Sequence, residues 1–221
     1  ISNSHRALLV KGQAYSPAFF DINGSSKWGQ ASLVNSSDPI FRALRDLAAI
    51  KPNENPYLAE YSRSMSTSLE QSAELARAIA TSSDPQTPFG ATSLDDKLRF
   101  LAKLLPVFKQ AGYQRQVFMV DWGAFDTHTG QRGSDTLTQD YQLAVVSKAM
   151  GSFQAALDVV GLSENVTTFM MTDFSRTLMP ATSNGSDHAW GNHFWVMGGR
   201  VRGGTVYGQF PDLVLGGKDD C

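Results

Sequence analysis

The clearest hydrophobic pattern in the chain is an apolar stripe with the spacing of an α-helix, and it occurs twice. In the first stretch the apolar positions are Leu94, Leu98, Leu101, Leu105 and Phe108. Ser93 and Asp96, three residues apart, have the pattern of a capping box, and Gly112 follows the last apolar position. This pattern predicts a helix that begins at Ser93 and ends before Gly112.

The second stripe predicts a longer helix over about residues 138–160, which Gly161 ends. Its apolar positions are Val146, Ala149, Met150, Phe153, Leu157 and Val160.

Two further helices are predicted in the first third of the chain. One covers "IFRALRDLAAI" after Ser37 or Asp38 and Pro39, because proline is favoured at the first helical position. The other covers roughly residues 57–82. The proline-containing loop 82–93 is the best internal boundary.

Apolar runs of strand length flank the helix at 138–160. They are "QVFMVDW" (116–122) and "NVTTFMMTD" (165–173). A strand, a long helix and a second strand form a βαβ unit, which predicts a parallel sheet with helices on its faces. Further strands are expected around the glycine-rich turn of "HFWVMGGRVRGGTVYGQF", and residues 1–35 are expected to be irregular or β-rich.

These elements predict one α/β domain over residues 1–221. Residues 1–92 would form a cover region rich in loops and helices. Residues 93–221 would form the sheet core, with a site at the strand ends.

Composition narrows the class of protein. Of the 221 residues, 42% are hydrophobic and 18% are charged, so the chain is globular rather than disordered. The formal net charge is −2 and no basic run occurs, which argues against nucleic-acid binding. No stretch has the apolar length of a membrane-spanning helix. The single cysteine, Cys221, is interpreted as an incidental thiol or a cleavage remnant.

Polar residues that can bind metal follow both predicted strands. In open parallel sheets, ligands bind beyond the carboxyl ends of the strands. Aspartate and histidine together are the ligand set for zinc, manganese or iron. The candidates are Asp126, His128, Asp173, Asp187, His188 and His193, with Arg176 beside them.

Alternative interpretations remain for several of these residues. Asp126 and Asp173 each follow a predicted strand, where an aspartate usually forms a turn or caps a helix. His193 can equally make a structural hydrogen bond. Arg176 can pair with a surface carboxylate or bind phosphate or sulfate with two hydrogen bonds.

Spacing adds a further constraint on the candidate ligands. Asp126 and His128 point the same way if "DTH" is extended, and can then share a metal ion. Asp187 and His188 are adjacent, so they can bind two different metal ions. Alternatively, one of them binds an ion and the other contacts a ligand of that ion.

Four segments resemble the large bacterial family known as domain of unknown function 1501. They are "GAFDTHTGQ", "MTDFSRT", "NGSDHAWGNHFWVMGGRVRGG" and "VYGQFP". The resemblance runs from about residue 5 to 217 and is densest over 116–211. It implies the alkaline phosphatase and sulfatase superfamily, with a three-layer α/β/α fold, a mainly parallel sheet, and a two-metal site that hydrolyses esters.

The resemblance also implies roles for individual residues. Asp126 and His128 match the first metal-binding group of the superfamily, and Asp173 matches the second. His188 or His193 matches a later histidine ligand. Phe174 stands where active relatives usually carry a histidine, and Asp187 can compensate for it.

The expected function is therefore metal-dependent hydrolysis of phosphate or sulfate esters. One or two divalent metal ions (zinc, manganese, calcium or magnesium) are expected. The substrate would be an anionic small molecule or a glycan ester, bound by Arg176 and Asn192, with Arg176 stabilising the anionic group. The resemblance further implies a bacterial protein that is periplasmic or secreted.

The family pattern also sets an expectation about completeness. The first strand of such a domain and its Ser or Thr nucleophile are expected upstream of Ile1, so the chain is expected to be incomplete at its N-terminus. By itself the chain would then not hydrolyse esters, unless it is active with a single metal ion. Phe174 motivates the alternative of a non-catalytic exported protein that binds a partner or has a structural role.

Overall fold

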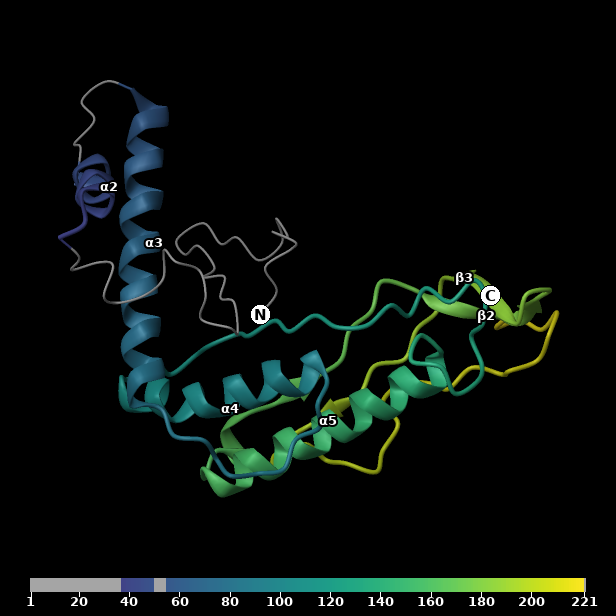
Figure 1. Ribbon diagram of the computed structural model, residues 1–221. Helices are drawn as coiled ribbons and strands as arrows, with labels where there is room; N and C mark the ends of the chain where they lie inside the picture. Colours follow the sequence, from purple (N-terminus) through teal and green to yellow (C-terminus); the bar gives the residue numbers. More distant parts are fainter. Residues whose placement is uncertain (1–36, 50–54, 221) are drawn as a thin grey trace. The chain divides into compact units, whose positions relative to one another are not determined.

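The computed structural model describes residues 37–49 and 55–220 (Figure 1). The predicted irregular or β-rich segment 1–35 and Cys221 lie outside these residues. Helices and strands follow in the order α2 (Pro39–Ala49), α3 (Pro56–Thr81), α4 (Ser93–Gln110), α5 (Gln139–Val159), the 3-10 turn η2 (Ser163–Asn165), β1 (Thr168–Phe169), β2 (Ser175–Ala181), β3 (Gly185–Ala189) and β4 (Val196–Met197).

Helix α2 begins as its sequence predicts, and α3 begins within one residue of its predicted position. Oδ1 of Asp38 accepts a hydrogen bond from the backbone N–H of Ile40 at 2.8 Å, and Pro39 is the first helical residue of α2. Asn55 caps α3 in the same way, and Pro56 follows it. Both starts are local signals, which is why the sequence alone locates them.

Helix α4 has the predicted kind of N-terminal cap, but the cap lies one residue earlier. The backbone N–H of Asp95 donates to the hydroxyl of Thr92 at 3.3 Å, and the backbone N–H of Thr92 donates to the Asp95 carboxylate at 3.0 Å. The pair that forms the capping box is therefore Thr92 and Asp95, and the prediction of Ser93 and Asp96 was wrong.

The first predicted apolar stripe is buried throughout, and the second is buried at four of its six positions. All five apolar positions of α4 are buried, and Phe153 and Leu157 of α5 are among the most deeply buried side chains of the described residues. Gly112 and Gly161 follow the two helices with φ of +88° and +67°, a left-handed conformation that favours glycine.

The chain divides into two compact units. The first contains the described residues up to Asp84 together with residues 103–121, and the second contains residues 85–102 and 122–220. In the first unit, the hydroxyls of Ser62 and Ser66 on α3 donate to the carbonyls of Leu47 and Ala48 on α2. In the second, a buried core forms from α5 and the start of α4.

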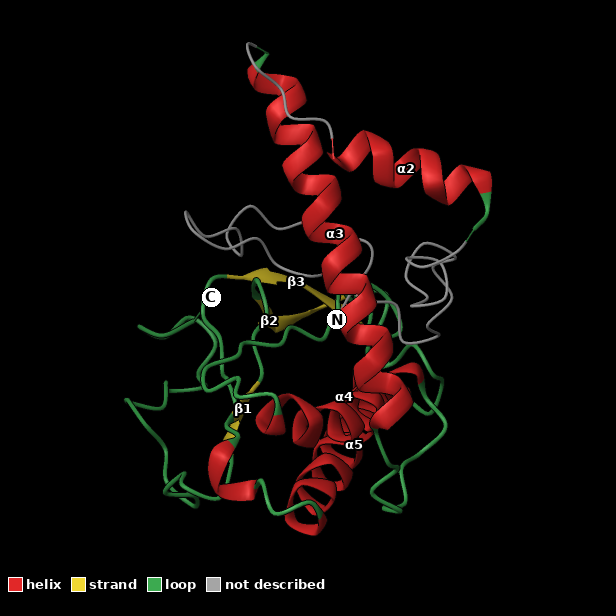
Figure 2. Cartoon of the chain, turned by 90° about the vertical axis from the view of Figure 1, so that its left-hand side faces the viewer, coloured by secondary structure: helices red, strands yellow, loops and turns green. Residues whose placement is uncertain are grey.

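The predicted three-layer α/β/α fold with a mainly parallel sheet is wrong for the described residues. Their strands form two antiparallel pairs, β1 with β4 and β2 with β3, and no parallel pair. Figure 2 shows the strands as short yellow segments among helices and loops. The pairs are short: β1 and β4 have two residues each. The described part of the chain is mainly helix and loop.

The parallel sheet was predicted from two apolar runs of strand length, and neither run forms the strand that its composition predicts. Residues 116–122 form no strand, and Val117 is 92% exposed. The run at 165–173 contributes only β1, which pairs with β4 rather than with a parallel neighbour. A strand needs a partner at the right distance, and an apolar run does not by itself provide one.

No helix within the described residues is long and apolar enough to cross a membrane.

Candidate metal centre

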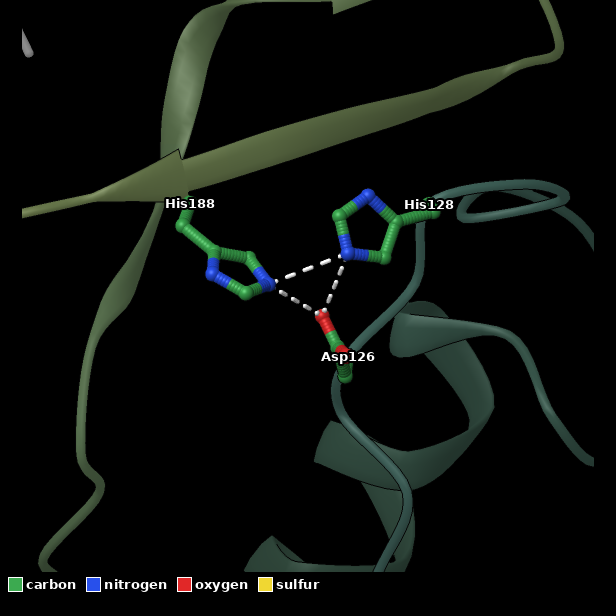
Figure 3. Close-up of side chains that lie close together, drawn as sticks. All are labelled: Asp126, His128 and His188. Atoms are coloured by element: carbon green, nitrogen blue, oxygen red, sulfur yellow. Dashed lines mark hydrogen bonds and ion pairs between the residues drawn. The ribbon is translucent and has the colours of Figure 1, made fainter.

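Three of the predicted ligands converge in the second unit: Asp126, His128 and His188 (Figure 3). Nε2 of His188 lies 2.9 Å from Oδ1 of Asp126 and 3.0 Å from Nε2 of His128. The third side, between Nε2 of His128 and Oδ1 of Asp126, measures 3.1 Å. Three donor atoms from two distant segments thus form a nearly equilateral triangle, and they can hold a metal ion.

The loop that carries Asp126 and His128 is anchored by a buried glutamine on α5. Gln142 is almost fully buried. Its Oε1 accepts from the backbone N–H of Ala124 at 2.7 Å, and its Nε2 donates to the carbonyls of Ala124 and Leu137. Every polar group of this side chain has a backbone partner, so the start of the loop is fixed relative to the helix.

Backbone hydrogen bonds then join this loop to the turn that precedes β3. The N–H groups of Gly130 and Gln131 donate to the carbonyls of Ser183 and Asn184, and the N–H of Ser186 donates to the carbonyl of Thr127. A Cβ at Gly185 would meet the His128 carbonyl oxygen at 2.0 Å. Glycine at this position therefore permits the close approach that brings His188 to His128.

The β2–β3 hairpin places Arg176 and His188 directly opposite each other. Cross-strand partners project from the same face of an antiparallel pair, so both side chains reach Asp126. The ring of Phe174 stacks on the His188 imidazole at 4.1 Å between centroids, with an interplanar angle of 24°. This contact supports the orientation of the imidazole.

The Arg176 side chain is buried beside the triangle, with only 7% of it exposed. One guanidinium N–H donates to Oδ1 of Asp126 at 2.6 Å, and two others bind the hydroxyl and the carbonyl of Ser186. The Ser186 hydroxyl in turn donates to Gln131. Pairing with Asp126 compensates the buried positive charge and fixes one carboxylate oxygen.

The surroundings of Asp126 lower the pKa of its carboxyl group. Partial desolvation raises this pKa. The hydrogen bonds from His188 and Arg176, with the charges of the two imidazoles, outweigh that effect. The carboxylate is therefore ionised at neutral pH, the form in which it binds a cation.

Hydrogen bonds alone cannot account for all three contacts among Asp126, His128 and His188. A neutral imidazole nitrogen either donates one proton or accepts one, and an ionised carboxylate only accepts. At most two protons are available on Nε2 of His128 and His188, so at least one of the three contacts has no proton between its atoms. A cation that accepts a lone pair from all three atoms satisfies every contact at once.

Asp187 lies behind the triangle rather than in it. Its Oδ1 is 3.8 Å from Nδ1 of His128, the nitrogen on the other side of the ring, and accepts a hydrogen bond from the backbone N–H of His188 at 2.8 Å. The sequence left open whether Asp187 and His188 bind two ions or share one. This geometry favours a single ion that His188 binds directly, with Asp187 contacting the ligand His128 from its other side.

The remaining candidates lie outside the triangle. Asp173 is exposed in the bend before β2 and is not among the converging ligands. The ring of His193 lies 5.0 Å from that of Phe210. Asn192 donates to the hydroxyl of Thr172 at 2.6 Å and accepts from the backbone N–H of His193. Their roles toward metal or substrate stay predictions.

Sequence reasoning did not identify the supporting residues Gln142, Ser186 and Gln131. Nothing in the sequence marks them, because their partners lie elsewhere along the chain. Gln142 binds backbone groups of Ala124 and Leu137, and the side chains of Ser186 and Gln131 bind each other. The hairpin did carry a signal, since Asn184-Gly185 between two runs is typical of a tight hairpin turn, and Asn184 has φ of +56°.

A family model described as "Protein of unknown function (DUF1501)" matches residues 33–219. The match covers most of the chain, so the chain belongs to this family, and the predicted resemblance to it is confirmed. The implied link to the alkaline phosphatase and sulfatase superfamily stays a prediction. No curated protein and no solved structure matches the chain.

Proposed function

We propose that this member of the DUF1501 family binds a divalent metal ion through Asp126, His128 and His188 and uses it to hydrolyse phosphate or sulfate esters. The observation that carries the proposal is the convergence of three metal-ligand atoms within 3.1 Å of one another. Two imidazoles and a carboxylate suit zinc, manganese and iron better than calcium or magnesium, which prefer oxygen ligands alone.

A cation at this site would stabilise the negative charge of the ester oxygens and activate an attacking water molecule. In the reaction, the water oxygen bonds to phosphorus or sulfur, the bond to the ester oxygen breaks, and the leaving alcohol takes up a proton. Hydrolysis therefore needs no oxidant or reductant.

The chain's own residues prepare the site for this reaction. Arg176 is a positioning residue, because its guanidinium holds Oδ1 of Asp126. Phe174 stacks on His188, and Asp187 lies on the far side of the His128 ring. About half of each ligand side chain is exposed, which leaves the site accessible to substrate.

The four motifs resemble the DUF1501 family, and the superfamily that this resemblance implies, that of alkaline phosphatases and sulfatases, supports ester hydrolysis as the reaction class. The described residues do not form that superfamily's parallel sheet, so the proposal depends on the chemistry of the site. Export to the periplasm or the medium is part of the same proposal.

A second candidate is a non-catalytic metal-binding protein. The position of Arg176 favours it, because the guanidinium binds Asp126 and Ser186 within the chain and is nearly buried, whereas an anion-stabilising arginine needs access to substrate.

The two candidates differ in turnover. The protein is loaded with Zn²⁺ or Mn²⁺ and assayed with p-nitrophenyl phosphate and p-nitrophenyl sulfate, alongside His188→Ala and the control His193→Ala. The hydrolase predicts turnover that a chelator and His188→Ala both abolish and that His193→Ala retains. Bound metal with no turnover would favour the second candidate.

A further inference from the structure

We infer that the cation is bound on one face only, as a six-coordinate ion with three neighbouring positions open to water and to a chelating oxygen anion. This inference rests on the proposed metal site. It goes further by specifying the coordination number of the ion and the kind of ligand that completes it.

The donor set, its exposure and the spacing of its ligand atoms together carry the inference. Metal–nitrogen and metal–oxygen bonds in such sites are about 2.0–2.2 Å. With bonds of about 2.1 Å, two ligands at a tetrahedral angle lie about 3.4 Å apart, and two ligands at a right angle lie about 3.0 Å apart. The observed separations are 2.9, 3.0 and 3.1 Å. These separations are compatible with right angles between three ligands on one face of an octahedron.

The described residues provide no fourth protein ligand. Asp126, His128 and His188 make up the whole group of converging ligand atoms in the described part of the chain. Asp187 is held on the Nδ1 side of the His128 ring, and the ring of His193 lies against Phe210. A structural zinc site usually has four protein ligands, so this triangle is of the open kind.

The solvent exposure of the three ligand side chains supports an ion with one side open to solvent. The side chains of Asp126, His128 and His188 are 54%, 50% and 51% exposed, although their ligand atoms converge. Two histidines and one carboxylate on a single face, with open positions opposite, form the donor set that proteins use for Fe²⁺. We therefore expect Fe²⁺, Mn²⁺ or Co²⁺ to keep six ligands here.

The charge balance indicates what binds at the open positions. A divalent cation with one carboxylate and two neutral imidazoles has a net charge of +1. The guanidinium of Arg176 beside Asp126 and the carboxylate of Asp187 beside His128 offset each other, so the site keeps that charge. Anions with two adjacent oxygen atoms fit this face, because both oxygens can occupy neighbouring positions. Phosphate and sulfate esters carry such oxygen pairs.

Visible spectroscopy of the Co²⁺-loaded protein tests the inference without an activity assay. Six-coordinate Co²⁺ absorbs weakly in the visible range, whereas tetrahedral Co²⁺ absorbs strongly. We expect a weak spectrum for the wild type and for His193→Ala, and no bound Co²⁺ for His188→Ala. Acetohydroxamate, a chelating oxygen anion, should change the spectrum of the wild type.

The outcomes separate this inference from the proposed function. Failure of the wild type to bind Co²⁺ overturns both. Binding with a strong, tetrahedral spectrum leaves the metal site in place and overturns the six-coordinate arrangement. A weak spectrum that acetohydroxamate leaves unchanged overturns the open face.

Discussion

Arg176 and His188 are direct cross-strand partners in the β2–β3 hairpin, and both contact the same carboxylate oxygen, Oδ1 of Asp126. One strand thus supplies a candidate metal ligand and the other supplies the residue that orients a second ligand. The hairpin register determines both, so the site depends on this register as much as on the identity of its ligands.

Replacing Arg176 with Met should weaken metal binding by about 10- to 100-fold, the usual effect of removing a group that orients a ligand. The Asp126 carboxylate loses its guanidinium partner, while the three ligands remain. Titration calorimetry with Mn²⁺ measures the change, and Arg176→Lys tests whether charge alone is enough. The control is Arg132→Met, since Arg132 pairs with Asp140 on the surface. Unchanged affinity in Arg176→Met would contradict the positioning role.

The substitution Gly185→Ala should separate the hairpin from the ligand loop. Its Cβ would meet the His128 carbonyl oxygen at 2.0 Å and the backbone nitrogen of Thr129 at 2.7 Å. We expect a loss of about 1–3 kcal/mol or more in the free energy of unfolding, together with weaker Mn²⁺ binding. Gly151→Ala is the matched control, because open space surrounds Gly151 in α5, and alanine there should stabilise by about 0.5–1 kcal/mol.

Replacing Gln142 with Leu should destabilise the protein by about 2 kcal/mol or more, because it leaves backbone groups at Ala124 and Leu137 without a partner. Gln154 on the same helix is the control, since its buried Oε1 has no partner within the described residues. Gln154→Leu should change stability by less than about 0.5 kcal/mol or improve it. Urea unfolding of both variants makes the comparison, and equal losses would contradict it.

The capping box of α4 gives a direct test of its assignment. Thr92→Ala should lower the free energy of unfolding by about 0.5–2 kcal/mol, because the N–H of Asp95 loses its acceptor. Ser93→Ala should change it by less than about 0.5 kcal/mol. The reverse order in thermal unfolding would restore the assignment that the sequence suggested.

The helices could be predicted from the sequence because their signals are local. Pro39, Gly112 and Gly161 lie within a turn of the helix ends that they mark, and the apolar stripe of α5 repeats with the period of the helix. These features need no information about distant residues.

The sheet could not be predicted in the same way, because pairing joins distant residues. The run at 116–122 has the composition of a buried strand, yet Val117 and Met119 are exposed. Conversely, β2 contains Arg176 and Pro180, which obscure a strand pattern, and it forms because β3 lies opposite. The partner determines whether such a segment becomes a strand.

The candidate site could be predicted from the sequence only in part. Residue types and their positions after predicted strands placed Asp126, His128 and His188 among six candidate ligands, since aspartate and histidine are typical metal ligands. The sequence could not separate them from Asp187 or His193, because that distinction depends on the hairpin register and on the contact between Gly185 and His128.

Asp126, His128 and His188 are proposed to hold one metal ion together. The most direct test is Mn²⁺ titration calorimetry of the wild type, His128→Ala, His188→Ala and His193→Ala. We expect one ion per chain in the wild type and in His193→Ala, with at least a tenfold loss of affinity in the other two variants. Equal affinity in all four proteins, or no binding to the wild type, would contradict it.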